Sequence, residues 1–531
     1  MKHNTLALLL LILTSTAEAQ LLSKDQYKHY IDRFNENDYE LYRLGEYTNE
    51  KAWDFLAENM PFFNCPDKQL EETYYFRWWT YRKHIRKTPE GYIITEFLPD
   101  VSWAGLYNSI CCPAAHHFME GRWLKDPKYL KDYARFWFNG KSTPRAYSFW
   151  AADAIANFCK VHPDDPLLEE LFPLLEKNYE AWEKDKLHEN GLFWQYDNRD
   201  GMEVSISGSY AEPYGHGYRA TINSYMYADA CALEQLAKKI GNGQKGTLYQ
   251  QKAEKIKQNI NTHLWDSEAE FFKVIPLGRN MSFSDVREEH GFTPWYFNIP
   301  PDSYSVAWKY LMDTNHFFAP YGITTAEQCH SKFIIAYEGH ECRWDGPVWP
   351  FSTSVTLTAL ANLLNNYKQE YISKRDYWTL LSQYSHSHRI HFDNSKSVPW
   401  IDENINPYTG DWISRTRLKN DFETSWPKNK GGEERGKDYN HSTFNDLIIT
   451  GLIGIRPSDD NILTINPLIP DQTWEYFCLD DLFYKGKKVT VCYDRTGKYY
   501  NQGSGFFVFV DGKKVYHSDN VGKVIVNLEN I

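Results

Sequence analysis

Acidic side chains recur in three separated segments that are also rich in aromatic or turn-forming residues. Residues 196–205 read YDNRDGMEVS, residues 341–350 read ECRWDGPVWP, and residues 400–410 read WIDENINPYTG. Segments of this composition are typical of loops, and catalytic groups are often carried on loops held by a rigid scaffold. We expect the three segments to converge on one site that binds a sugar.

Two separated carboxyl groups are what hydrolysis of a glycosidic bond requires, because one protonates the leaving oxygen and the other activates water. Glu203 is predicted to be the general acid, since burial near other carboxylates raises a carboxyl pKa and keeps the group protonated. Glu403 is predicted to be the base. Asp200 is the alternative acid, and Glu338 or Glu341 is an alternative base. A helix cap or a surface ion pair is the competing interpretation of each glutamate.

Three tryptophans are predicted to line the sugar site. Trp344 and Trp349 lie in the second acidic segment, and Trp103 follows the acidic run that contains Glu96 and Asp100. Indole rings offer flat apolar faces for stacking. Packing in the core is the competing interpretation for Trp349, because Pro350 is suited to begin a helix.

Asp345, Arg219 and Arg343 are predicted to bind sugar hydroxyls. A carboxylate accepts hydroxyl hydrogen bonds, and a planar guanidinium can bind two hydroxyls or a carboxylate. An ion pair is an equally good interpretation of either arginine. The isolated histidines and the nine scattered cysteines lack metal-type spacing, so the sequence predicts no metal and no cofactor.

The elements that must position these residues are predicted to be helices up to about residue 455. Several candidates carry apolar residues at helical spacing. The predicted helices span residues 24–36, 70–87, 102–118, 127–138, 147–161, 167–184, 221–240, 245–265, 348–367, 369–387 and 439–452.

After about residue 455 the sequence pattern changes from helical to strand-like. Residues 461–468, 487–493, 505–510 and 521–528 are short β-branched or aromatic runs separated by turn-forming residues, which predicts antiparallel strands. The sequence therefore predicts a helical catalytic domain over residues 20–455 and a small C-terminal β-sandwich-like domain over residues 456–531.

Three motifs in this order resemble those of six-hairpin glycosidases: the trehalases, the processing α-glucosidases and the mannosylglycerate-hydrolase-like enzymes. The motifs are GMEVS at 201–205, WDGPVWP at 344–350 and ENINPYTG at 403–410. The resemblance implies an (α/α)6 barrel, an inverting mechanism and exo-action. Glu203 stands where these families usually have Asp, and the arginine that often follows is absent, so the resemblance leaves the choice between Glu203 and Asp200 open.

Composition and the N-terminal sequence indicate which binding partners and which cellular location to expect. The formal net charge of −12 disfavours nucleic acid and anionic membranes as partners, and the 19 Trp and 38 Tyr suit carbohydrate binding. Residues 1–19 have a basic start, a short apolar run and small residues before Gln20, which predicts a signal peptide. No cysteine follows the apolar run there, so we expect a periplasmic or secreted protein without a lipid anchor and without a membrane-spanning helix.

The predicted function is an exported, exo-acting, inverting glycoside hydrolase. A polysaccharide lyase is the alternative within enzymes, although it would need a basic groove for an acidic substrate. A carbohydrate-binding protein without catalysis is the alternative from another class. The sequence predicts neither the sugar nor the oligomeric state.

Overall fold

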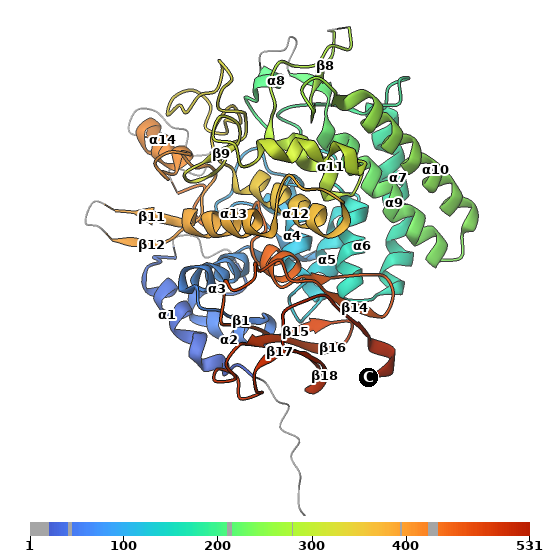
Figure 1. Cartoon of the computed structure of the whole chain (residues 1–531). Coiled ribbons are helices and arrows are strands. Elements are labelled where there is room, and N and C mark those ends of the chain that lie inside the picture. The colour runs from blue at the N-terminus through green and yellow to red at the C-terminus, as the bar shows by residue number, and fades with distance from the viewer. Residues whose placement is uncertain (1–20, 41–44, 210–214, 279, 393–395, 423–433) are drawn as a thin grey trace, which may run out of the picture.

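The computed structural model describes residues 21–40, 45–209, 215–278, 280–392, 396–422 and 434–531. The predicted signal peptide, residues 1–19, lies outside the described residues. The described chain is mainly helical, with small antiparallel sheets (Figure 1). None of its helices combines the length and the apolar character that crossing a membrane takes.

The helical body consists of long helices joined by loops. In chain order the α-helices of eight or more residues in the described chain are α1 (Lys28–Glu36), α2 (Ala52–Asn59), α3 (Lys68–Lys83), α4 (Ala114–Gly121), α5 (Lys128–Trp137), α6 (Ala151–Val161), α7 (Asp165–Lys186), α9 (Ala220–Lys239), α10 (Gly243–Asn259), α12 (Pro350–Asn366), α13 (Lys374–Ser387) and α14 (Ile413–Phe422).

Side-chain chemistry at the helix ends explains where several of them begin. Asp67 caps α3 by accepting from the backbone N–H groups of Gln69 and Leu70, and Ser373 caps α13 in a reciprocal capping box with Asp376. Pro350 is the first residue of α12, as predicted, because a proline at that position loses no helical hydrogen bond.

Neighbouring helices pack against one another in succession. The contacts run from α3 to α13, α12, the short α11 (Thr293–Tyr296), α9, α6 and α4. α3, α9 and α12 are buried along most of their length. Their buried residues include polar and charged side chains beside the apolar and aromatic ones, so these helices are enclosed by other elements on most sides.

Two predicted helices are shorter than expected, and one ends early. The range 102–118 forms a helix only in α4, because Tyr107 and Asn108 adopt positive φ and break the run. Of the predicted helix over residues 439–452, the structure forms a π-helix over Leu447–Leu452. α3 ends at Lys83, and the chain continues into a hairpin of β2 (Ile85–Thr88) and β3 (Gly91–Ile94).

The predicted C-terminal strands are confirmed as β14 (Ile462–Ile465), β16 (Lys487–Asp494), β17 (Gly505–Val510) and β19 (Val524–Asn527). The sequence did not predict β15 (Tyr476–Tyr484) or β18 (Lys513–Ser518), which complete an antiparallel sheet in the order β1-β15-β16-β17-β18. β13 (Ile455–Arg456), β14 and β19 form a second sheet.

One strand of the larger sheet comes from the N-terminal part of the chain. β1 (Phe62–Asn64) pairs with β15, with Phe62 opposite Asp480. Leu22 N–H also donates to the Asp480 carboxylate at 2.8 Å. An N-terminal strand and C-terminal strands thus share one sheet, which lies at the end of the molecule opposite α8 (Ile206–Ser209) (Figure 1).

Candidate active site

The three acidic segments meet, as predicted. Trp344 N–H donates to the Glu203 carbonyl at 3.1 Å, which joins the first segment to the second. Val348 and Ile405 exchange both backbone hydrogen bonds, at 3.0 and 2.9 Å, which joins the second to the third. Backbone bonds fix the relative positions of three segments that are far apart in the sequence.

A cavity of about 320 Å³ lies where the segments meet. Its walls combine carboxyl groups, two arginines, histidines and aromatic rings. The lining residues include Glu96, Glu203, Glu341, Arg199, Arg435, His340, His441, Phe97, Trp103, Tyr147, Trp344, Trp349 and Tyr439. Convergent polar groups among aromatic walls are typical of a site that binds a small polar ligand.

Glu203 enters the cavity from a tight turn. Gly201 and Val204 both adopt positive φ, and a Cβ on Gly201 would stand 2.6 Å from Cys112 Sγ, so the turn requires glycine there. The pKa of Glu203 is raised to about 8. Burial is the largest cause, a backbone hydrogen bond lowers the pKa by less, and the carboxylates of Asp197, Glu403 and Glu341 add to the rise. Glu203 is therefore protonated at neutral pH.

Glu403 is fully buried and lies against a guanidinium. Arg435 donates to its Oε1 from Nε, at 2.8 Å, and also from Nη2. The other oxygen accepts from Ser414 Oγ at 3.1 Å and lies 3.4 Å from the Cys342 thiol. Hydrogen bonds from a guanidinium are stronger than neutral ones, so these contacts fix the position of the Glu403 side chain. Glu403 is not among the residues that line the cavity.

Glu341 shares the same guanidinium and lines the cavity. Arg435 Nη1 donates to its Oε1 at 2.8 Å. Burial would raise the pKa of Glu341, but Arg435 outweighs burial and lowers it to about 2. The site thus holds a protonated carboxyl group on one side, Glu203, and an ionised one beside Arg435 on the other.

Glu96 adds a second carboxyl group that keeps its proton. The pKa of Glu96 is raised to about 8. Burial is the largest cause, a hydrogen bond from Tyr439 lowers the pKa, and the carboxyl groups of Glu403 and Glu203 raise it. Tyr439 Oη donates to Glu96 Oε1. Glu96 and Tyr439 come from opposite ends of the helical region, so the fold rather than local sequence brings them together.

The three predicted tryptophans line the cavity. Trp344 and Trp349 stack on one another with centroids 4.7 Å apart and planes inclined by 13°, and Trp349 Nε1 donates to the Arg343 carbonyl at 2.7 Å. Trp103 is 38% exposed, and the Arg435 guanidinium lies 5.3 Å from its ring centroid. Trp103 therefore offers an accessible ring at this site.

Four other predicted site residues lie apart from the cavity lining. Asp200 accepts from Arg219 Nε at 3.0 Å and from Thr221, and both members of this ion pair are fully buried. Asp345 is paired with Arg343, whose Nε lies 3.1 Å from Oδ1. These contacts match the ion-pair interpretation of the two arginines, and the roles predicted for the four residues stay predictions.

The sequence did not single out Arg435 or Tyr439. Arg435 stands in a charged run, residues 433–438, that resembles an ordinary solvated segment. Its burial, 1% exposed, is a consequence of two distant glutamates that face it. No local pattern could have indicated that pairing.

Comparison with known proteins identifies the family. Residues 106–442, more than half of the chain, match the mannosylglycerate hydrolase MGH1-like glycoside hydrolase domain. A solved sialidase is 39% identical and superposes with a TM-score of 0.86 over 95% of this chain and 44% of that chain. The GH78 family rhamnosidase of Bacillus sp. GL1 is 11% identical, with a TM-score of 0.51 over 82% of this chain and 40% of that chain, a likeness of fold alone.

A curated relative from Borreliella burgdorferi, an uncharacterized protein, is 26% identical over 155 residues, which is 29% of this chain and 31% of that protein. The chain thus spans less than half the length of the sialidase and of the rhamnosidase, and the match to the curated relative covers less than a third of that protein.

Proposed function

Because the chain belongs to the mannosylglycerate hydrolase MGH1-like glycoside hydrolase family, we propose that its cavity hydrolyses glycosidic bonds. The observation that carries the proposal is the contrast in protonation across the cavity. Glu203 has a pKa of about 8 and is protonated at neutral pH. Glu341, beside Arg435, has a pKa of about 2 and is ionised at the same pH. An acid and a base are available together at neutral pH.

In the proposed reaction Glu203 gives its proton to the glycosidic oxygen as the bond to the anomeric carbon breaks. A water molecule attacks that carbon from the other face of the ring and loses a proton to a carboxylate. The products are a free sugar of inverted configuration and the protonated leaving group. Inversion follows the family resemblance and is part of the proposal.

Two carboxylates on Arg435 are candidates for the base. Glu403 is the predicted one, but its oxygens already accept from Arg435 and Ser414 and lie close to the Cys342 thiol, so it needs a local rearrangement to reach water. Glu341 already lines the cavity. We propose Glu403 as the base and Glu341 as the alternative. The Glu403→Gln and Glu341→Gln variants distinguish the two.

The charges of the cavity favour a neutral sugar. Arg435 is already bound to Glu341 and Glu403, Glu96 and Glu203 keep their protons, and Arg199 is the second guanidinium in the lining. The carboxylate of a sialoside or a uronide would therefore rely on Arg199 and would lie in one cavity with the ionised Glu341. We therefore propose a neutral glycoside, and we do not transfer the activity of the larger sialidase to this chain. The same charges disfavour a lyase acting on uronates.

The remaining features of the proposal concern architecture and location. The succession of helix contacts from α3 to α4 supports an (α/α)6 toroid over residues 20–455, with the β strands after residue 455 as a separate unit. A cavity at the small end of the usual range for ligand sites suits action at a chain end. Residues 1–19 support export to the periplasm or the medium.

The test is turnover of neutral oligosaccharides and aryl glycosides by wild type and by Glu203→Gln, Glu403→Gln and Glu341→Gln. Glu338→Gln tests the other alternative base, and Glu189→Gln is the control, because Glu189 is exposed and lies outside the cavity lining. We expect release of an inverted sugar, followed by NMR, with Glu203→Gln and Glu403→Gln inactive and the control unchanged. Activity retained by Glu403→Gln and lost by Glu341→Gln would move the base to Glu341.

The same assay addresses the other two functions. Ultraviolet absorbance from an unsaturated product would contradict hydrolysis and indicate a lyase. Saturable binding of a glycan that the intact protein never cleaves would contradict catalysis altogether and leave a carbohydrate-binding protein.

A further inference from the structure

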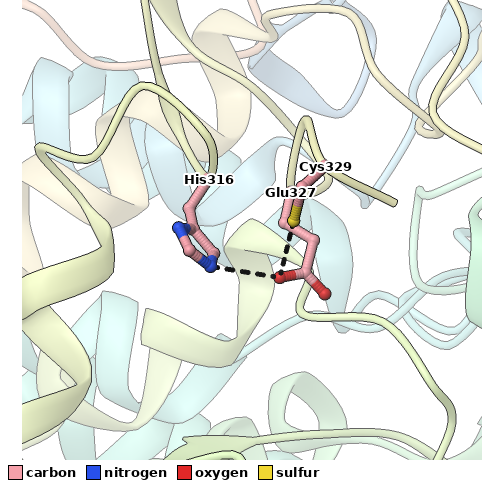
Figure 2. A group of neighbouring side chains, drawn as sticks. All are labelled: His316, Glu327 and Cys329. Atoms are coloured by element: carbon pink, nitrogen blue, oxygen red, sulfur yellow. Dashed lines mark hydrogen bonds and ion pairs between the residues drawn. The ribbon is translucent and has the colours of Figure 1, made fainter. Parts of the chain in front are cut away.

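A second group of ligand-type side chains lies outside the cavity. Figure 2 shows His316, Glu327 and Cys329 directed toward one another. One ligand atom from each lies within 4.8 Å of the others. His316 Nε2 is 3.6 Å from Glu327 Oε2, and Cys329 Sγ is 3.8 Å from the same oxygen. The mixture of imidazole, carboxylate and thiol suits a borderline divalent cation such as Zn²⁺.

These separations are close to those that a metal ion would impose. Tetrahedral zinc with bonds of about 2.0–2.3 Å holds neighbouring ligand atoms about 3.3–3.7 Å apart. Of the two separations to the Glu327 carboxylate, 3.6 Å from His316 lies within this spacing and 3.8 Å from Cys329 exceeds it slightly. Binding would therefore need small side-chain movements and no change of backbone.

The backbone around the triad is fixed by hydrogen bonds between its two segments. Gln328 N–H donates to the His316 carbonyl at 2.9 Å, and Cys329 N–H donates to the Asn315 carbonyl at 2.8 Å. The Gln328 side chain donates to the carbonyl groups of His316 and Phe318, at 3.2 and 3.0 Å. The segment with the imidazole and the segment with the carboxylate and thiol are thus held together before any ligand binds.

Outer partners of the kind found around metal ligands are also present. Asp313 Oδ2 lies 3.3 Å from the other ring nitrogen of His316, although the two are not aligned as a hydrogen bond. Arg287 binds Glu327 through its backbone N–H and through Nη1, both at 2.9 Å. Carboxylates that face a ligating imidazole, and donors that hold a ligating carboxylate, orient such ligands. Arg287 also competes with a cation for Glu327, so affinity must be measured.

We propose that His316 Nε2, Glu327 Oε2 and Cys329 Sγ bind one Zn²⁺-type cation, with water in the remaining position. Cys329 is exposed, so its thiol proton can leave to solvent as the sulfur–metal bond forms. The site is structural in this proposal. It does not take part in hydrolysis, and it does not depend on the proposed function.

The position of the triad indicates what the cation would stabilise. Tyr321 N–H donates to the Pro407 carbonyl at 3.0 Å, and Tyr408 Oη donates to Gln328 Oε1 at 2.9 Å. The segment that carries the triad therefore packs against the segment that follows Glu403. A cation bound here would stabilise the loop that packs against the segment following Glu403.

The experiment is titration of chelator-treated, full-length protein with Co²⁺, followed by absorption spectroscopy, and with Zn²⁺ in competition with a chromophoric chelator. We expect one Co²⁺ per chain and a thiolate-to-cobalt charge-transfer band. Cys329→Ser should abolish the band, and His316→Ala should abolish tight binding. Asp313→Asn should weaken binding by about 10–100-fold.

Matched controls are Cys231→Ser, a partly buried cysteine elsewhere, and His330→Ala in the same loop. Both should bind Co²⁺ as wild type does. Absence of the band in wild type, or a band that survives Cys329→Ser, would overturn the proposal. Circular dichroism confirms that each variant is folded, and an increase in Tm with Zn²⁺ in wild type but not in Cys329→Ser is the second expected result.

Discussion

Glu203 and Glu403 are both carboxyl groups of one site, but Glu403 is fully buried against a guanidinium, whereas Glu203 is half-buried and has no ion pair with a cation among the described residues. Desolvation, with a smaller contribution from nearby carboxylates, raises the pKa of Glu203 to about 8. Glu341, on the same arginine as Glu403, has its pKa lowered to about 2 despite burial. The position of one arginine thus divides similar side chains into proton donors and proton acceptors.

Asp200 extends the comparison, because it lies only three residues before Glu203. It is fully buried and is paired with Arg219. A buried ion pair of this kind has structural consequences, whereas a buried carboxyl group without a cation beside a cavity has chemical ones. Each prediction below tests one side of this comparison.

The largest effect is expected for Glu203→Gln. Loss of a positioned general acid lowers kcat/KM by about 10³–10⁴-fold, with a smaller loss on aryl glycosides whose leaving groups need no protonation. The measurement is steady-state kinetics on both substrate types. Equal losses on both types would contradict the role of Glu203 as the acid.

Asp200→Asn should affect stability instead. Removal of the charge leaves Arg219 buried without its ion-pair partner, which costs about 3–5 kcal/mol of unfolding free energy. Urea unfolding of Asp200→Asn beside Glu203→Gln measures the difference. Glu203→Gln should be close to wild type, because Gln replaces a carboxyl group that is already neutral at pH 7. A stable Asp200→Asn protein with no activity would instead favour Asp200 as the acid.

Arg435→Lys should lower kcat by about 100-fold with little change in stability of the fold. Lysine keeps the charge but loses the planar fork that reaches Glu341 and Glu403 together. The basic limb of the pH profile should stay in place, since Glu203 is on the other side. A variant as active as wild type would show that the shared guanidinium does not position the base.

The pH dependence should show a basic limb near pH 8. The general acid works when protonated, so kcat/KM is at its maximum below the pKa of Glu203 and falls as pH rises through about 8. Glu96 titrates in the same range, so the limb reports both groups. A profile that declines already between pH 5 and 6 would contradict a protonated Glu203.

The smallest effect is expected for Asp197→Asn. The Asp197 carboxylate contributes to the raised pKa of Glu203, so its removal should move the basic limb to lower pH. Glu189→Gln, an exposed residue of the preceding turn, should leave the limb unchanged. A shift to higher pH, or no shift, would indicate that burial alone sets the pKa.

Local sequence predicted the elements whose cause is local. Helices α5, α6, α9 and α10 and strands β16 and β17 were predicted close to their observed bounds, because periodicity and turn residues mark them. The range 102–118 was wrong over its first part, since positive φ at Tyr107 and Asn108 depends on contacts that the sequence does not display.

The site divides in the same way. Motif order predicted that the segments that carry Glu203, Trp344 and Glu403 would meet, and backbone hydrogen bonds join them. It did not distinguish Glu203 from Asp200, because the difference lies in Arg219, which is paired with one and not the other. Arg435 could not be predicted, since its burial depends on tertiary contacts with glutamates that are distant in the sequence.

The strand β1 gives the chain an order of assembly. The Leu22 bond to Asp480 joins residues 458 positions apart, and β1 pairs with a strand that is made much later. The larger sheet can take up β1 only after β15 exists. Contacts of such sequence separation are slow to form. During synthesis β1 therefore has no partner strand in this sheet until β15 has been made.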